Sequence, residues 1–347
     1  MRAAKTINLQ EIADKAGVHR STASRALNLA TRHLVAPAVA ARIQSIAEEV
    51  GYRADPLAAG LRTRRSRMAA WVAPNLGDPL LAPLLSGLEA GLAERGYATL
   101  LARADRDNPH RLAVVESLIA RRVEGLFLTD ASPDDPILTR CAEADVAIVL
   151  VNCNETDGCP AIMPDYGQGS RMAIEHLAAL GHSRIAFLGS PIHLPTSKMR
   201  LHGYVSAVRA AKLARGPTVF AADLSPGAGR IAAAKLFDDP GFTAIVAAAD
   251  SLAFGAIQEF AARGLDCPSD ISIVGQDDLG LGLLVAPELT SIRFCHADLG
   301  RRAVDLLFEQ IESRRDTFRT ERMSPVLFVR KSTAHASVRA SSHERRL

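Results

Sequence analysis

The sequence predicts a mixed α/β protein in which a short all-helical module precedes a larger domain of parallel β-sheets. Three observations support this fold class. Apolar residues recur at helical spacing through the first fifty residues, whereas short apolar runs alternate with amphipathic segments from Met68 onward. The charge changes at the same point, because residues 1–65 carry eleven Lys/Arg and five Asp/Glu while the remainder carries thirty and thirty-three. A small basic module on a mildly acidic body is typical of a nucleic-acid-binding head on a larger domain.

Residues 7–28 (INLQEIADKAGVHRSTASRALN) predict two short helices joined by a tight turn. Asn8 is placed to cap the first helix, and Gly17 to end it in a left-handed conformation. On the second helix, Ala23, Ala26 and Leu27 are expected to face inward. The residues left outside are Arg20, Ser21, Thr22, Ser24 and Arg25. Arginines and short hydroxyls on one helix face suit the major groove of DNA. The alternative is an ordinary helical hairpin with a solvated face.

A third helix is predicted over Pro37–Val50, whose apolar residues at helical spacing can close a three-helix core. Ala36 precedes it and has no side chain that could cap the helix, although Pro37 fits the first turn. In the loop before this helix, Arg32 and His33 either contact DNA phosphate or simply face solvent.

Residues 51–63 (GYRADPLAAGLRT) carry the most specific motif of the chain. They resemble the hinge motif Tyr-x-x-Asn-Pro-x-Ala-x-x-Leu of the lactose/galactose repressor (LacI/GalR) family of bacterial transcription factors. The resemblance implies a helix-turn-helix headpiece over residues 1–53, then a hinge helix and linker over residues 54–66. In the family the hinge leucine, here Leu61, wedges between base pairs in the minor groove. With the helix face above, the implied DNA-binding residues are Arg20, Ser21, Thr22, Ser24, Arg25, Asn28, Ala58, Leu61 and Arg62.

Two departures from the motif affect the expected hinge helix. Asp55 replaces the usual asparagine and brings a negative charge near phosphate, although it is also a good helix cap. Gly60 disfavours helix by roughly 1 kcal/mol relative to alanine. We therefore expect this hinge to be harder to order than a typical one.

From Met68 onward, short apolar runs predict strands and the segments between them predict helices. The predicted strands are Ala69–Ala73, Thr99–Ala102, Gly125–Leu128, Val146–Val151, Ile185–Gly189, Val219–Ala221, Ala244–Ala247 and Ile271–Val274. The predicted helices are Leu80–Arg95, Pro109–Arg122, Ile137–Ala144, Gly167–Leu180, Met199–Lys212, Ala228–Phe237 and Leu252–Arg263. This alternation indicates parallel sheets wound right-handedly, and so many units favour two Rossmann-like lobes over one sheet.

The family resemblance implies that these lobes form a periplasmic-binding-protein-like effector domain over residues 67–332. Lobe 1 would comprise about 67–164 and 294–323, and lobe 2 about 165–293 and 324–332, with the chain crossing near Pro164, Arg293 and Ser324. Segments Asp298–Glu312 and Val326–Val329 resemble the family's return helix and closing strand. Residues 333–347 are expected to form a disordered tail without the leucine heptads that make some members tetramers.

Ligands of such folds bind at the carboxyl ends of the strands, which selects polar candidates here. Arg200 lies in a segment that resembles the family's Arg-x-x-Gly-[Phe/Tyr] motif, whose arginine grips effector oxygens. Asp277 lies in one that resembles Val-Gly-[Phe/Tyr]-Asp-Asp, whose first aspartate accepts from effector hydroxyls. The predicted effector-binding residues are Asp78, Thr129, Asn152, Arg200, Asp250, Asp277 and His296, with Asp130 and Asp278 also at strand ends. Salt bridges at lobe edges are the alternative role.

The chemistry of the effector is less specific. A carboxylate and a forked guanidinium together suit a sugar with vicinal hydroxyls. However, Ala249-Asp250 stands where the family usually has Asn-Asp, and Gln276 replaces an aromatic residue. Despite these departures a sugar is the first expectation, and a smaller acid or a non-sugar metabolite is the alternative.

Other function classes lack their signatures. The five cysteines form no zinc or disulfide pattern, and we predict neither a metal nor a cofactor. An enzyme fused to a DNA-binding head would need a catalytic motif, and none of the common ones occurs. A transport or chemosensory binding protein would be exported, whereas no signal peptide or membrane span is found, so we expect a cytoplasmic, nucleoid-associated protein.

The predicted function is therefore that of a non-enzymatic transcriptional regulator, and we expect it to be a repressor. It would be a homodimer that binds double-stranded DNA at a pseudo-palindromic operator. A small-molecule effector, a sugar or related metabolite, would control operator affinity, and the sequence leaves open whether it induces or corepresses.

Overall fold

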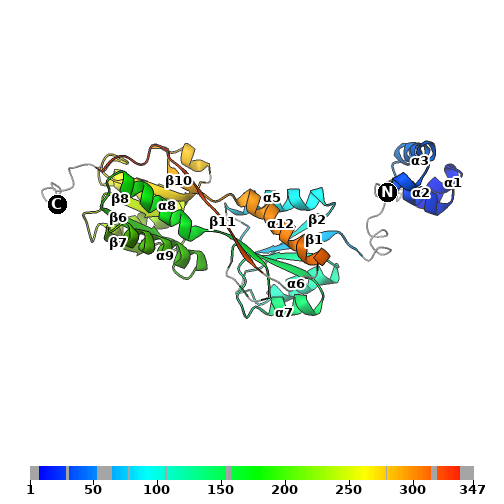
Figure 1. Cartoon of the computed structure of the whole chain (residues 1–347), viewed down its shortest axis with the longest axis horizontal. Coiled ribbons are helices and arrows are strands. Elements are labelled where there is room, and N and C mark those ends of the chain that lie inside the picture. Colours follow the sequence, from blue (N-terminus) through cyan, green and yellow to red (C-terminus); the bar gives the residue numbers. More distant parts are fainter. Residues whose placement is uncertain are drawn as a thin grey trace, which may run out of the picture. The chain divides into compact units, whose positions relative to one another are not determined.

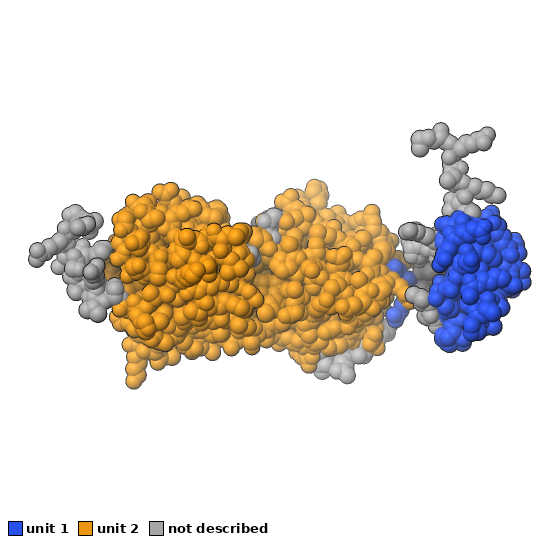
Figure 2. All heavy atoms as spheres, turned by 90° about the horizontal axis from the view of Figure 1, so that it is seen from above, with its two compact units in different colours: residues 1–66 blue, residues 67–347 orange. Residues whose placement is uncertain are grey.

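The computed structural model describes residues 8–28, 31–52, 65–76, 79–105, 108–153, 156, 158–278, 280–313 and 319–336. The chain divides into two compact units, residues 1–66 and residues 67–347 (Figure 2). The hinge residues Asp55, Ala58, Gly60, Leu61 and Arg62 lie outside the described residues, and so does Asp78.

The first unit is the predicted helix-turn-helix module. Its elements are α1 (Leu9–Lys15), α2 (Arg20–Leu27), the short 3-10 helix η1 (Arg32–Leu34) and α3 (Pro37–Glu49). Asn8 caps α1 as predicted, because its Oδ1 accepts from the backbone N–H groups of Gln10 and Glu11 at 2.9 and 3.1 Å. Gly17 has a φ of +60° and ends that helix. Ile12 and Ile43 are fully buried in the core that the helices share.

Two arginines of this module satisfy carbonyl groups at helix ends. The Nη2 of Arg42, on α3, donates to the carbonyl of Ala16 at 2.8 Å, and the Nε of Arg32 donates to that of Ala26 at 3.2 Å. The last carbonyls of a helix lack intrahelical partners, so these bonds fix the loops that follow α1 and α2. Arg32 thus has a structural role within the module, whereas His33 is exposed. Ala36 makes no side-chain cap on α3, as predicted.

The second unit contains two six-stranded sheets, each covered by helices on both faces (Figure 1). The strand order is β11-β5-β4-β3-β1-β2 in the first sheet and β12-β10-β9-β8-β6-β7 in the second. All neighbouring strands pair in parallel except β10 and β12. The strands of the first sheet are β1 (Met68–Ala73), β2 (Ala98–Arg103), β3 (Gly125–Leu128), β4 (Ala147–Val151), β5 (Ala161–Pro164) and β11 (Thr320–Met323). Those of the second are β6 (Arg184–Gly189), β7 (Ala214–Phe220), β8 (Ala244–Ala247), β9 (Ser272–Asp277), β10 (Thr290–Arg293) and β12 (Val326–Phe328).

Helices on both faces explain why the central strands are apolar along their whole length. In β1, Trp71 packs with helices α5 and α12, whereas Val72 points to the opposite core, which α6 and α7 cover. In the second sheet, α8 and α9 cover one face, and α10 and α11 the other. The helices are α5 (Leu81–Glu94), α6 (Arg111–Ala120), α7 (Pro136–Glu143), α8 (Tyr166–Ala179), α9 (Pro195–Ala210), α10 (Pro226–Leu236), α11 (Asp250–Ala262) and α12 (His296–Ser313), with a 3-10 helix η2 (Leu281–Leu283). The predicted α/β class with two parallel lobes is confirmed.

The chain passes between the two sheets three times, always through a very short connection. The passages lie between β5 and α8, between β10 and α12, and between β11 and β12. The first sheet and its helices are called lobe 1 below, and the second lobe 2.

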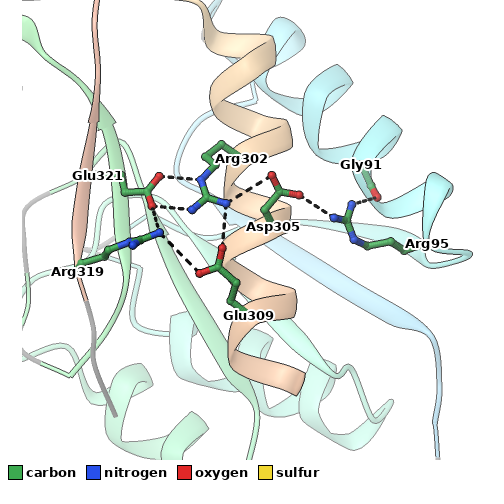
Figure 3. A network of polar contacts seen from close by, with 7 residues as sticks. All are labelled: Gly91, Arg95, Arg302, Asp305, Glu309, Arg319 and Glu321. Carbon is green, nitrogen blue, oxygen red and sulfur yellow. Dashed lines mark hydrogen bonds and ion pairs between the residues drawn. The ribbon is translucent and has the colours of Figure 1, made fainter. Parts of the chain in front are cut away.

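An ion-pair network in lobe 1 ties the return helix α12 to strand β11 (Figure 3). The guanidinium of Arg302 donates to both carboxylate oxygens of Glu321, at 2.7 and 2.8 Å, and this lowers the pKa of Glu321. Arg302 also pairs with Glu309 at 3.0 Å, and Arg319 pairs with Glu321 at 2.7 Å. Because β11 is an edge strand without a fully buried side chain, these contacts add to its backbone pairing with β5.

Several elements differ from the sequence prediction. Strands β5, β10 and β11 were not predicted, β7 begins at Ala214 instead of Val219, and α9 begins at Pro195 instead of Met199. The expected disorder from residue 333 onward is wrong for residues 333–336. There the Oγ1 of Thr333 contacts the Nε2 of His176 at 3.0 Å, and the N–H of Ala336 donates to the carbonyl of Leu180 at 2.9 Å.

Candidate DNA-binding and effector sites

The candidate DNA-binding face lies on α2. Arg20, Ser21 and Arg25 are exposed, Thr22 and Ser24 are half-buried, and Asn28 is exposed at the end of the helix. Ala23 and Ala26 are fully buried against the other helices, so the face and the core separate as predicted. The helix therefore presents two arginines and hydroxyl groups to the outside of the module.

The start of α2 is held by a residue that the sequence analysis did not single out. The Nδ1 of His19 accepts from the backbone N–H of Ser21 at 3.3 Å and contacts the Ser21 hydroxyl at 2.8 Å. An imidazole can accept only on its unprotonated nitrogen, so this cap requires a lone pair on Nδ1. It orients the Ser21 hydroxyl in the first turn, beside Arg20.

The candidate effector site is built around Arg200 of α9, a guanidinium that is only 6% exposed. Its Nη2 donates to the Asp277 carboxylate at 3.1 Å, and its Nε donates to the Oε1 of Gln276 at 3.1 Å. Both partners end strand β9, at the carboxyl edge of the lobe 2 sheet. Gln276 in turn donates to the Ser170 hydroxyl of α8 at 3.1 Å. The fork of Arg200 is thus fixed in orientation before any ligand binds.

Aromatic rings lie against the same guanidinium and extend the site toward lobe 1. The Cζ of Arg200 is 3.9 Å from the centroid of the Tyr166 ring and 5.8 Å from that of Phe294. The Tyr166 hydroxyl donates to the Oδ1 of Asn152 at 2.6 Å. Asn152 follows β4 of lobe 1, so a continuous set of contacts leads from Asn152 through Tyr166 and Arg200 to Asp277.

His296 is the fourth predicted residue near this set. It begins α12 directly after the second passage between the lobes, and it is 5% exposed. Burial, and then the charge of Arg200, lower the pKa of His296 to about 4, so its imidazole is neutral at physiological pH. Its Nε2 is buried and makes no hydrogen bond to the described residues. A buried polar atom without a partner is uncommon in native proteins and is consistent with a ligand or water contact.

The other predicted effector residues have partners of their own. The Thr129 hydroxyl donates to the carbonyl of Val72 at 3.1 Å and accepts from the Nε1 of Trp71 at 2.9 Å. Asp250 is fully buried and accepts from the Ser291 hydroxyl at 2.6 Å. These contacts lie within lobe 1 and within lobe 2 respectively, and each fixes the end of a strand.

Asp278 differs sharply from its neighbour Asp277. Its carboxylate is 1% exposed and is held by Arg293 at 2.6 Å and by Arg330 at 2.7 Å. Arg293 ends β10 at the second passage, and Arg330 follows β12. Asp278 therefore links three segments of lobe 2 to one another, which is a role in the fold and not in ligand binding.

Backbone strain marks the same strand ends. Asn152, Asp130, Asp277 and Asp278 have φ values of +56°, +67°, +104° and +51°, in the region that side chains rarely adopt. Such conformations cost of the order of 1–3 kcal/mol each and concentrate at ligand sites. Strands β3, β4 and β9, which all carry sequence-predicted candidates, thus end at residues in this region.

Sequence reasoning missed Tyr166, Gln276 and a buried cation in lobe 1. The only sequence signal for Gln276 was that it replaces an aromatic residue, and its amide now fixes Arg200. Arg111 begins α6, is 5% exposed, and pairs with Asp135 at 3.1 Å, while its Nε and Nη1 have no hydrogen bond to the described residues. No motif in the sequence distinguishes Arg111 from a surface arginine.

The chemistry available at the site is recognition of a polar ligand. Arg200 supplies donors, Asp277 acceptors, His296 a neutral imidazole nitrogen, and Tyr166 and Phe294 apolar faces. Within the described ranges, no cluster of three or more His, Cys, Asp or Glu side chains could hold a metal ion. No helix in that part of the chain is long and apolar enough to cross a membrane.

The two units match two family models. A model for bacterial regulatory proteins of the lacI family matches residues 8–55, and one for a periplasmic binding protein-like domain matches residues 174–333. The transcriptional regulator CelR in complex with cellobiose is a similar solved structure, with a TM-score of 0.71 and 27% identity. That alignment covers 94% of this chain and 99% of the regulator.

Two relatives extend the similarity over nearly the whole chain. The HTH-type transcriptional repressor CytR of Escherichia coli (strain K12) is 28% identical over 328 residues, covering 94% of this chain and 96% of the repressor. An uncharacterized HTH-type transcriptional regulator of Streptomyces limosus is 32% identical over 343 residues, covering 94% of each chain. Since the likeness includes both the helical module and the two lobes, the chain belongs to the lacI family of bacterial regulatory proteins.

Proposed function

We propose that this protein is a transcriptional repressor whose affinity for an operator is controlled by a polyhydroxylated small molecule bound around Arg200. The observation that carries the proposal is the connected set Asn152, Tyr166, Arg200 and Asp277, which links lobe 1 to lobe 2 through side-chain contacts. A ligand that contacts this set contacts both lobes.

The ligand chemistry follows from the polar groups that are gathered at the site. The Nη1 of Arg200 makes no hydrogen bond to the described residues, and neither does the Nε2 of His296. A donor, a carboxylate and a neutral imidazole beside aromatic faces suit adjacent hydroxyl groups on a ring. CelR binds cellobiose, and we assign the same class of ligand, a sugar, to this chain.

Control of DNA binding requires that the ligand distinguish two arrangements of the lobes. A ligand shifts such an equilibrium only by the difference between its affinities for the two states. The hinge segment directly precedes β1 of lobe 1 in the chain. A movement of lobe 1 would therefore act first on the hinge, which joins this lobe to the DNA-binding module. We propose that two chains act together, since symmetric heads on a pseudo-palindromic operator double the few base contacts of one head.

The test compares two neighbouring carboxylates. An operator is selected from random duplexes with the full-length chain, and a ligand is found by thermal shift against a panel of mono- and disaccharides. Asp277→Asn should leave operator affinity unchanged but raise the ligand concentration for half-maximal response by about tenfold or more, because an amide cannot replace the charged acceptor.

Asp278→Asn is the matched control, because it removes the same charge one residue away. It should lower the thermal stability by weakening the bonds to Arg293 and Arg330, yet respond to ligand like the wild-type chain. A folded Asp277→Asn protein with a normal ligand response would refute this placement of the effector site. Arg200→Gln should behave like Asp277→Asn.

A further inference from the structure

The start of α2 carries two exposed side chains that are hydrogen-bonded to each other. His19 is the N-cap residue of the helix, and Ser21 is the second residue within it. The Nδ1 of His19 lies 2.8 Å from the Ser21 Oγ and 3.3 Å from the Ser21 backbone nitrogen. Because Ser21 is exposed, its hydroxyl is accessible to a molecule that binds to this face of the module.

The backbone decides the direction of the hydrogen bond between these two side chains. The helix fixes the direction of the Ser21 N–H, and this group donates to Nδ1. Nδ1 must therefore carry a lone pair, because a proton on it would point at the proton of the N–H. The Ser21 hydroxyl can rotate, and at 2.8 Å from the same lone pair it donates its single proton to Nδ1. The Ser21 oxygen thus presents two lone pairs and no donor to its surroundings.

We propose that Ser21, held as a hydrogen-bond acceptor by His19, recognises the exocyclic amino group of one operator base. The phosphates and sugars of DNA offer acceptor oxygens, so a hydroxyl that can only accept gains no hydrogen bond from them. In the major groove the donors are the N6 amino group of adenine and the N4 amino group of cytosine. The acceptor atoms of guanine and thymine would instead face the lone pairs of Ser21. His19 is then a positioning residue, because it acts through Ser21.

The hydrogen bond to His19 narrows the set of bases that a serine hydroxyl can recognise. A free hydroxyl donates or accepts, and serine is accordingly compatible with any base. With its proton directed at Nδ1, Ser21 should favour adenine and cytosine over guanine and thymine on the strand that it contacts. This grouping differs from purine against pyrimidine and from A·T against G·C, so a set of operator variants can reveal it. The inference rests on the proposed function, because it requires an operator that contacts α2.

The experiment measures binding of the full-length chain to the selected operator and to its single-base variants. Comparison of the wild type with Ser21→Ala identifies the base pair whose preference depends on Ser21. At that pair in one half-site, purine in place of adenine, or 2-pyrimidinone in place of cytosine, removes only the amino group. This change should weaken binding of the wild type by about fivefold more than binding of Ser21→Ala. The 7-deaza analogue of the purine in the same pair lacks the acceptor N7, and it should produce no such difference.

Variants of His19 test the source of the preference. His19→Gly removes the imidazole acceptor, and glycine is well tolerated at an N-cap. It should abolish the effect of the amino group at that base pair and leave the preferences at other pairs unchanged. His19→Asn offers an amide oxygen to the same two donors and should restore the effect. Ser24→Ala removes another hydroxyl of α2 and should behave like the wild type at that pair.

Three results would each overturn the assignment of Ser21 without affecting the proposed function. Ser21→Ala could have the same preferences as the wild type at every pair. The Ser21-dependent effect could follow N7 and not the amino group. His19→Gly could keep the full effect of the amino group. A chain that selects no operator at all would contradict both this assignment and the proposed function.

Discussion

At the scale of single residues, we predict that Arg20 of α2 recognises a base of the operator. It is exposed in the first turn, beside the His19–Ser21 cap. Arg20→Ala should cost roughly 1–3 kcal/mol in operator binding and relax the preference at one position of the operator. The measurement is a titration against the selected operator and its single-base variants.

Arg32→Ala serves as the control for this prediction, because Arg32 donates to the carbonyl of Ala26 within the module. It should lower thermal stability without changing the preference for any base. If Arg20→Ala weakens all sequences equally, then Arg20 contacts phosphate and not a base edge.

His296 makes the stability of the chain depend on pH. Its folded-state pKa of about 4 lies below the ordinary value of 6.5, so the unfolded chain binds more protons between these two values. The stability that neutral His296 contributes is therefore complete above about pH 6.5 and is lost as the pH falls toward 4, with an upper limit of ~3 kcal/mol. Unfolding by urea at a series of pH values should show this slope.

His296→Gln should flatten the slope between pH 4 and 6.5, because an amide does not titrate. Burial also lowers the pKa of His176 and of His182, so part of the slope should persist in the variant. An unaltered slope in His296→Gln would mean that its imidazole reaches solvent more freely than the structure indicates.

The residue scale also shows where sequence reasoning stops. The motif around Asp277 and Asp278 placed both carboxylates at the end of a strand, and both lie there. Which of them meets Arg200 and which meets Arg293 and Arg330 depends on the backbone turn after β9, where both have positive φ. Residue type and spacing do not encode that turn.

At the scale of elements, the contact between α8 and α9 depends on the glycine at position 203. Gly203→Ala would bring a Cβ to 2.3 Å from the carbonyl oxygen of Gly167, and backbone atoms cannot rotate away. The substitution should therefore destabilise the two-lobed unit by roughly 1–3 kcal/mol, as overpacking does. Thermal unfolding measures the loss.

Gly227→Ala, on α10, is the matched substitution. An added Cβ there would meet only the Ser225 Oγ at 3.8 Å, and its φ is not in the left-handed region. It should be neutral or slightly stabilising, since alanine restricts the unfolded chain. Equal melting temperatures for the two variants would show that α8 and α9 can separate at little cost.

Two of the segments that sequence reasoning missed, β11 and the start of β7, belong to strands at or near a sheet edge. Strand β11 (TERM) is a polar edge strand held by the Arg302–Glu321 pairs, so it lacks the apolar pattern that predicts a strand. The start of β7 contains Gly216 and Pro217, a pair that predicts a turn, although an edge strand can contain both residues. The central strands were predicted because both of their faces are buried, and their sequences are apolar throughout.

At the scale of the whole molecule, the proposed dimer needs an apolar surface, and η2 offers one. Leu281, Leu283 and Leu284 are 53%, 54% and 81% exposed. Neighbouring exposed leucines of this kind are typical of a protein–protein contact. The double substitution Leu281→Glu and Leu284→Glu should therefore yield a monomer by light scattering, with a footprint that is lost or reduced to one half-site.

Ile192→Glu tests whether a charge at any exposed apolar position would also disrupt the dimer. Ile192 is 46% exposed but precedes α9, in another segment of lobe 2. This variant should remain a dimer. A dimer that survives the double leucine substitution would place the contact on a different surface.

The brevity of the three passages between the lobes limits how the lobes can move. One residue, Asp165, separates β5 from α8, and two residues separate β10 from α12 and β11 from β12. Two bodies joined by three such tethers keep few independent degrees of freedom, so rotation about the tethers is the movement that they restrict least. A ligand that contacts both lobes therefore favours particular angles of this rotation. Two different molecules that bind between the lobes would then act through the same angle. Their effects would add if both favour the same angle and would oppose each other if they favour different ones.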